Sequence, residues 1–211
     1  MAEFITEQLS DGKTPEQATN ALDFAAWSAL VARVEIPLTH AAQYGAEEIV
    51  ASIGVDLPDG TPEIDSWKIA QSYARERGAE MVGMKWVDDE LVPNPDAKWQ
   101  ITEGTRDMLR STIERGIKEG LTTDELKQLI MDSHSFSERR ANMIARTEIR
   151  MARAAGSYDA AVGLGCTHKY WTTAKDDKVS PECRANGLQE PVLISEPFAS
   201  GDMRNPAHPH C

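Results

Sequence analysis

The spacing of apolar residues predicts helices over much of the first half of this chain. Helical spacing runs through residues 14–34, 39–53 and 61–78. Pro37 is expected to separate the first two helices, because proline lacks the amide hydrogen that a helix interior needs. Gly78 is expected to end the third helix, since glycine favours the turn just past a helix end.

The second half predicts three more helices. An apolar stripe follows Thr102 and stops at Gly120. Thr122 and Glu125 then form the pattern of a capping box, in which a hydroxyl and a carboxylate each satisfy a backbone amide at the start of a helix. The longest run, at about residues 138–162, is rich in alanine and arginine, which suits a helix with one closely packed face and one solvated face.

Three segments are expected to be extended. Residues 81–92 predict a hairpin that turns at Asp88-Asp89, and the β-prone residues 168–173 and 191–195 predict two strands. The predicted fold class is therefore α+β, mostly helical, with a small β element in the C-terminal domain.

Charge divides the chain near a loop that contains Pro93 and Pro95, where we place a domain boundary. Residues 1–97 carry 18 acidic and 6 basic side chains, a net charge of −12, whereas residues 98–211 carry 16 of each. The first region is expected to be an acidic, mainly helical one. Because such a region repels phosphate, contact with DNA is disfavoured by charge, although residues 138–153 hold five arginines against two glutamates.

Composition places the protein among ordinary globular ones. The 211 residues are 41% hydrophobic and 27% charged. No apolar stretch approaches the roughly 18 residues of a membrane span, so we expect no membrane association. Three cysteines cannot all pair within one chain, which argues against a disulfide scaffold and favours a reducing cytoplasm.

Three residues near the C-terminus are predicted metal ligands. Cys183, His208 and Cys211 offer the thiolates and imidazole that zinc prefers, although a structural zinc site needs four ligands. Ser180 stands three residues before Cys183, where a zinc ribbon would carry a further cysteine. The alternative is that Cys183 packs among apolar side chains.

A second polar group suggests acid–base or metal-dependent hydrolysis. Asp176 and Asp177, with His168 before them and His208 after them, carry the residue types of a hydrolase or nuclease site. No spacing forces these side chains together. A turn in which the aspartates bind their own backbone is the simpler explanation of the pair.

Several segments occur in an order that resembles a known family. In chain order they are residues 101–106, 139–148, 169–174, 176–177, 183–187 and 206–211. The most specific pieces are the Ile-Ala-Arg-Thr-Glu stretch that ends at Glu148 and the His-Pro-x-Cys motif that begins at His208. Together, residues 98–211 resemble the phage Mu F-like minor head protein family, the phage head morphogenesis domain.

This resemblance implies a minor capsid component rather than an enzyme. It would bind the portal protein and the major capsid protein, and would be found in the virion head and, during assembly, in the host bacterial cytoplasm. On this interpretation Arg146, Glu148, Trp171 and Asp177 shape the interaction surface and carry no chemistry.

The sequence departs from the family pattern at two positions. Relatives commonly show Cys-x-x-Cys after the aspartates and a terminal His-Pro-Asn-Cys-Arg-Cys, whereas this chain has Ser180 and His210. The pattern implies a metal knot that has lost a ligand here, and its interruption suggests that the natural chain continues beyond Cys211. A hydrolase or nuclease and a zinc-stabilised binding module therefore stay open as alternatives.

Overall fold

The chain folds into two compact units, each built from two separate stretches of sequence. The computed structural model describes residues 1–23, 28–53, 63–98, 100–133 and 137–208. One unit comprises Met1–Ala32 and Glu76–Asn142, and the other comprises Arg33–Arg75 and Met143–Cys211. The division near residue 97 stays a prediction.

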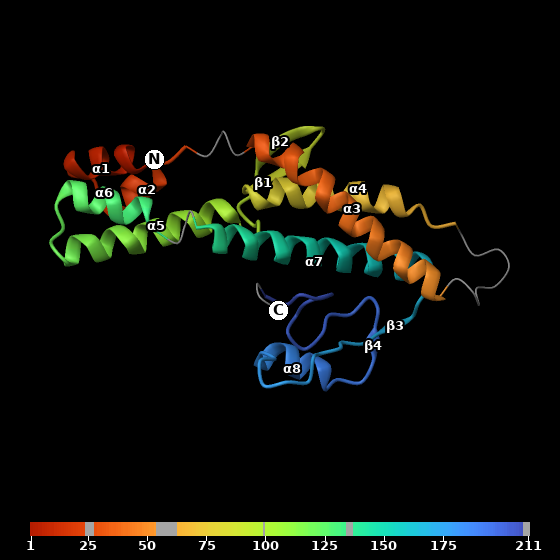
Figure 1. The fold of residues 1–211 in the computed structure, drawn as a ribbon. Helices are drawn as coiled ribbons and strands as arrows, with labels where there is room; N and C mark the ends of the chain where they lie inside the picture. The colour runs from red at the N-terminus through yellow and green to blue at the C-terminus, as the bar shows by residue number, and fades with distance from the viewer. Residues whose placement is uncertain (24–27, 54–62, 99, 134–136, 209–211) are drawn as a thin grey trace. The chain divides into compact units, whose positions relative to one another are not determined.

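Helices dominate both units, which confirms the mostly helical α+β class (Figure 1). The helices are α1 (Ala2–Ser10), α2 (Pro15–Asn20), α3 (Ser28–Ile53), α4 (Ser66–Met81), α5 (Ile101–Lys118), α6 (Thr123–Met131), α7 (Glu138–Gly163) and α8 (Pro181–Gly187). The strands form two antiparallel pairs, β1 (Met84–Val87) with β2 (Glu90–Pro93) and β3 (His168–Lys169) with β4 (Val192–Leu193).

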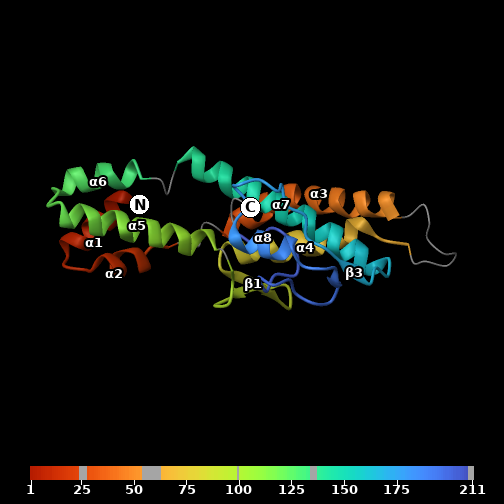
Figure 2. The ribbon, with the colours of Figure 1, turned by 90° about the horizontal axis from the view of Figure 1, so that it is seen from below.

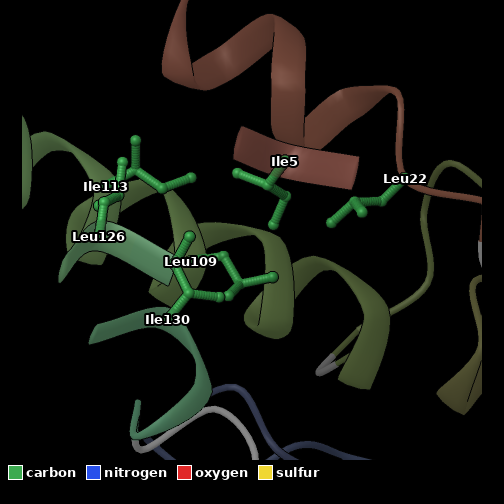
Figure 3. Close-up of a cluster of buried hydrophobic side chains, with 6 residues drawn as sticks. All are labelled: Ile5, Leu22, Leu109, Ile113, Leu126 and Ile130. Carbon is green, nitrogen blue, oxygen red and sulfur yellow. The ribbon is translucent and has the colours of Figure 1, made fainter. Parts of the chain in front are cut away.

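The core of the first unit lies between α1, α5 and α6. Its buried side chains point toward one another from these helices and from Leu22, the second residue after α2 (Figure 3). They are Ile5, Leu22, Leu109, Ile113, Leu126 and Ile130. At the surface, Lys127 of α6 and Glu3 of α1 form an ion pair of 2.7 Å. Helix α1 has no counterpart among the elements expected from the sequence.

Two local predictions in this unit are confirmed. Thr122 and Glu125 form the expected capping box, since the Thr122 amide donates to the Glu125 carboxylate at 2.8 Å and the Thr122 hydroxyl accepts from the Glu125 amide at 3.4 Å. The β1–β2 hairpin turns at Asp88 and Asp89, whose φ angles of 49° and 64° are those of a tight turn with both central residues left-handed.

The prediction of one helix over residues 14–34 is wrong. Helix α2 ends at Asn20, and Leu22 enters the core of the first unit, where its carbonyl accepts a hydrogen bond from Arg106 at 3.3 Å. A tertiary contact thus replaces the helical hydrogen bonding that periodicity alone suggested.

The expected interruption at Pro37 is also wrong, because this residue lies inside α3. An interior proline costs a helix about 3 kcal/mol. Here Leu38, Ala42 and Ala46 are buried at helical spacing beyond it, so packing of that stripe offsets the missing hydrogen bond.

Gly78 does not end its helix. Helix α4 continues to Met81, since Ala79 and Met81 are buried, and the left-handed residue after the helix is Gly83, with a φ of 77°. The predicted start of this helix, at residue 61, lies outside the described residues.

The strands in the second unit are shorter than predicted. Only two residues of each segment pair, His168 with Leu193 and Lys169 with Val192. The chain then leaves the ladder because Trp171 turns into an apolar cluster. The long helix expected at about residues 138–162 is confirmed as α7.

Candidate functional site

Helices α3 and α7 lie side by side within the second unit (Figures 1 and 2). Two glycines bring their backbones into contact. A Cβ atom at Gly156 would lie 1.8 Å from the carbonyl oxygen of Ala42, and one at Gly45 would lie 2.0 Å from that of Arg153. The Ser157 hydroxyl donates to the Gly45 carbonyl at 2.9 Å. Because no side chain separates the two helices there, α3 holds α7 in a defined position.

An ion pair strengthens this contact beside the glycines. The Arg153 guanidinium donates to both carboxylate oxygens of Glu48, at 2.8 Å from Nη2, and also lies 4.9 Å from the centre of the Tyr44 ring. The hydrogen bond to Glu48 raises the pKa of Arg153, which therefore stays charged.

The segment that follows α7 is fastened back onto this helix. The Tyr158 hydroxyl donates to the carbonyl of Ile194 at 2.9 Å, and the Lys169 ammonium donates to the carbonyl of Met203 at 2.7 Å. Lys169 also lies 5.1 Å from the Tyr158 ring, and Arg204 lies 5.8 Å from it. Cation–π contacts and hydrogen bonds therefore join the C-terminal segment to α7.

Partial burial perturbs the charged groups around this junction. Burial raises the pKa of Asp159, although the nearby Arg204 opposes the shift. Burial, and then the charge of Arg204, lowers the pKa of Lys169. Both shifts favour the neutral forms, as expected where water is partly excluded.

A small apolar cluster forms the centre of the C-terminal segment. Trp171 and Phe198 pack edge to face with ring centres 5.0 Å apart, and Cys183 is buried with them. Trp171 therefore packs at the centre of the segment, and its assignment to an interaction surface stays a prediction. Nearby, Asn186 is fully buried and exchanges hydrogen bonds with Ser200 at 2.8 and 3.0 Å.

Cys183 and His208, two of the predicted metal ligands, come together at the start of α8. The Cys183 sulfur lies 3.6 Å from His208 Nε2, which also lies 2.8 Å from the Ser180 hydroxyl. Ser180 caps α8, since its hydroxyl accepts from the Cys183 amide at 3.2 Å. The third predicted ligand, Cys211, lies outside the described residues.

A cavity of about 690 Å³ opens beside this corner. Its lining includes Arg150 and Arg153 of α7 and the segment 171–174, which belongs to no helix or strand. Lys178 and Asp176 also line it, so three cationic side chains accompany one acidic one. The cavity thus combines an excess of positive charge with a stretch of backbone outside the helices and strands.

The four residues of the hydrolase alternative do not all meet in this cavity. Asp176 and His208 line it, whereas His168 and Asp177 are exposed and are not among its lining residues. His168 Nδ1 contacts the Thr167 hydroxyl at 3.0 Å. The Asp176 carboxylate accepts from the Lys178 amide at 3.0 Å, which is the local turn that the sequence also allowed.

Two predicted site residues on α7, Arg146 and Glu148, differ in exposure. Arg146 is exposed, whereas Glu148 is 6% exposed. Neither side chain lines the cavity. Their assignment as residues that shape the interaction surface stays a prediction, as does that of Asp177.

Comparison with known proteins identifies the part of the chain that carries this site. The family model described as phage Mu protein F like protein matches residues 107–211. This C-terminal half of the chain belongs to the phage Mu F-like family. No curated protein and no solved structure matches the chain significantly.

The Mu F-like family makes this a protein of phage head morphogenesis. The cavity, the apolar cluster and the Ser180–Cys183–His208 corner all lie within the Mu F-like residues. Across the described ranges, no helix is long and apolar enough to cross a membrane.

The geometry of the Mu F-like corner meets only part of what a metal site needs. With zinc–sulfur and zinc–nitrogen bonds of about 2.3 and 2.0–2.1 Å, two tetrahedral ligands lie about 3.6 Å apart. The contact between Cys183 and His208 has this length. Among the described residues, however, no group of three histidine, cysteine or acidic side chains could hold a metal ion.

Sequence reasoning missed the residues that join the C-terminal segment to α7. Tyr158, Lys169 and Arg204 are far apart in sequence and carry no common motif. The alanine-rich composition of α7 predicted a closely packed face, which α3 covers in the structure. That composition did not identify Gly156 as the contact residue.

Proposed function

We propose that this protein is a phage or prophage minor head protein that binds the portal protein and the major capsid protein while the head is assembled. The observation that carries the proposal is the match of residues 107–211 to the Mu F-like family. The protein would act in the host cytoplasm during assembly and remain in the virion head.

The site supports a docking role rather than catalysis. Its buried groups are engaged in packing and internal hydrogen bonds, as Trp171 and Asn186 illustrate. His168 and Asp177 do not line the cavity that Asp176 and His208 share. We therefore propose that the protein is not an enzyme and that the cavity with Arg150 and Lys178 on its rim contacts a head protein.

Protein partners are favoured over DNA by charge. The net charge of −12 repels a phosphate backbone, and the cations beside the cavity are few. Positive side chains at a rim mainly steer and orient an acidic protein surface.

Co-purification tests this proposal. The full chain, co-expressed with the portal and major capsid proteins of the same phage genome, is expected to retain at least one of them on an affinity column. The double substitution Arg150→Glu/Lys178→Glu is expected to reduce the retained protein about tenfold, because like charges then face each other across the contact.

A matched variant controls for overall charge. Lys13→Glu/Lys118→Glu makes the same change in net charge at exposed positions of the first unit and should leave retention unchanged. If neither head protein is retained by the unmodified chain and mass spectrometry finds none of it in virions, the proposed function is wrong.

A zinc-stabilised binding module is a second candidate function, favoured by the contact of 3.6 Å between Cys183 and His208. In that case the purified full chain should contain about one equivalent of zinc by elemental analysis, and a chelator should lower its melting temperature. His208→Gln and Cys183→Ser should remove the metal, and Cys211→Ser tests the ligand predicted from the sequence.

Cys166 supplies the control for this measurement, because it is a half-buried free cysteine outside the corner. Cys166→Ser should leave the zinc content unchanged. If the protein contains no metal and the chelator does not change its melting temperature, this second candidate is excluded.

A further inference from the structure

The segment 172–174 beside the cavity has backbone groups that pair with no other residue in the part of the chain that the structure describes. Thr172, Thr173 and Ala174 follow β3 and belong to no helix or strand. Among the described residues, their amides and carbonyls make no hydrogen bond to other backbone or side-chain groups. All three line the cavity.

Such a backbone can accept an added strand. Backbone amides and carbonyls are strong hydrogen-bonding groups, and an extended peptide satisfies them by lying alongside as a further strand. The segment is well supported for this purpose, because Trp171 anchors its beginning in the apolar cluster and Thr173 lies against Gly187.

The side chains opposite the segment indicate which peptide fits. Arg150, Arg153 and Lys178 all line the cavity, and the side chains of Arg150 and Lys178 are exposed. Asp176 is the one acidic residue among those that line the cavity. An added strand with carboxylates on the side that faces α7 would meet this positive charge.

We propose that the cavity binds an extended, acidic segment of a head-protein partner, which pairs with residues 172–174 as an added strand and places its carboxylates against Arg150 and Lys178. This inference rests on the proposed function and specifies which part of the partner binds in the cavity. The occupant is a protein segment, since nucleic acid lacks the alternating amides and carbonyls that pair with a strand.

A peptide array tests the inference. Overlapping 12-residue peptides that cover the portal and major capsid proteins of the same phage are presented to the full chain. Binding is expected to concentrate on acidic peptides. For the strongest one, fluorescence anisotropy should show binding that weakens about tenfold with Arg150→Glu/Lys178→Glu and is unchanged with Lys13→Glu/Lys118→Glu.

The backbone requirement is tested on the peptide and therefore does not depend on a variant protein that folds. Methylation of alternate amide nitrogens keeps the charge and removes the donors of one strand edge. Methylation at one set of alternate positions should abolish binding, and methylation at the other set should be tolerated, since a strand presents alternate amides to each side.

Three results would overturn the inference. They are selective binding of basic peptides, equal binding of both methylated forms, and no peptide binding by a chain that still retains intact portal or capsid protein. The last result leaves the proposed function standing, because intact partners are then recognised by another surface. If intact partners also fail to bind, both proposals are wrong.

Discussion

Gly156→Ala is expected to destabilise the second unit by about 3 kcal/mol, the upper part of the range for overpacking. The added methyl group would lie 1.8 Å from the Ala42 carbonyl oxygen, a backbone atom that no rotamer change can move. The two helices must therefore separate, which also strains the hydrogen bond between Ser157 and Gly45. Hydrogen exchange of the α3 and α7 amides, with denaturant unfolding followed by circular dichroism, measures the effect.

Gly104→Ala is the matched control. Gly104 also lies inside a helix, α5, but a Cβ atom there meets only Arg140 Nη2 at 3.4 Å. Because alanine is a better helix former, this substitution should leave stability unchanged or raise it by up to about 1 kcal/mol. If both substitutions have the same effect, the close approach of α3 and α7 is not what stabilises the second unit.

Trp171→Ala is expected to cost about 3–5 kcal/mol, the range for removal of a buried aromatic side chain. Trp171 is 8% exposed and packs against Phe198 and Cys183. Its loss leaves a void beside the segment 172–174 and should increase hydrogen exchange over residues 168–198. The same variant should also weaken binding of head proteins, since the cavity wall loses its anchor.

The neighbouring residue provides the comparison for this variant. Tyr170 is 71% exposed, so Tyr170→Ala should change stability by no more than about 0.5 kcal/mol. An equal loss of stability in both variants would mean that the aromatic stretch acts through local strand propensity and not through the buried cluster.

The features that could be predicted from the sequence are those decided by neighbouring residues. The capping box at Thr122 and Glu125 depends on groups three residues apart, and the turn at Asp88-Asp89 depends on two adjacent residues. The α7 helix followed from its composition. In each case local chemistry and tertiary structure favour the same conformation.

The errors lie where tertiary packing outweighs local preference. Pro37 and Gly78 disfavour a helix interior, yet buried residues beyond each of them keep α3 and α4 helical. At the site, the residue types at Cys183 and His208 pointed to a shared role, but only the fold placed them 3.6 Å apart. The backbone of residues 172–174, which pairs with none of the described residues, has no signature in the side-chain sequence.

The interleaved units restrict how this family segment can be exchanged between proteins. Residues 107–211 include α7 but not its glycine-lined neighbour α3, and they include Leu109 and Ile113 but not Ile5. The packing of each unit is thus completed by residues that precede residue 107. A recombinant protein that joins this segment to a foreign N-terminal region can fold only if that region supplies helices of matching shape.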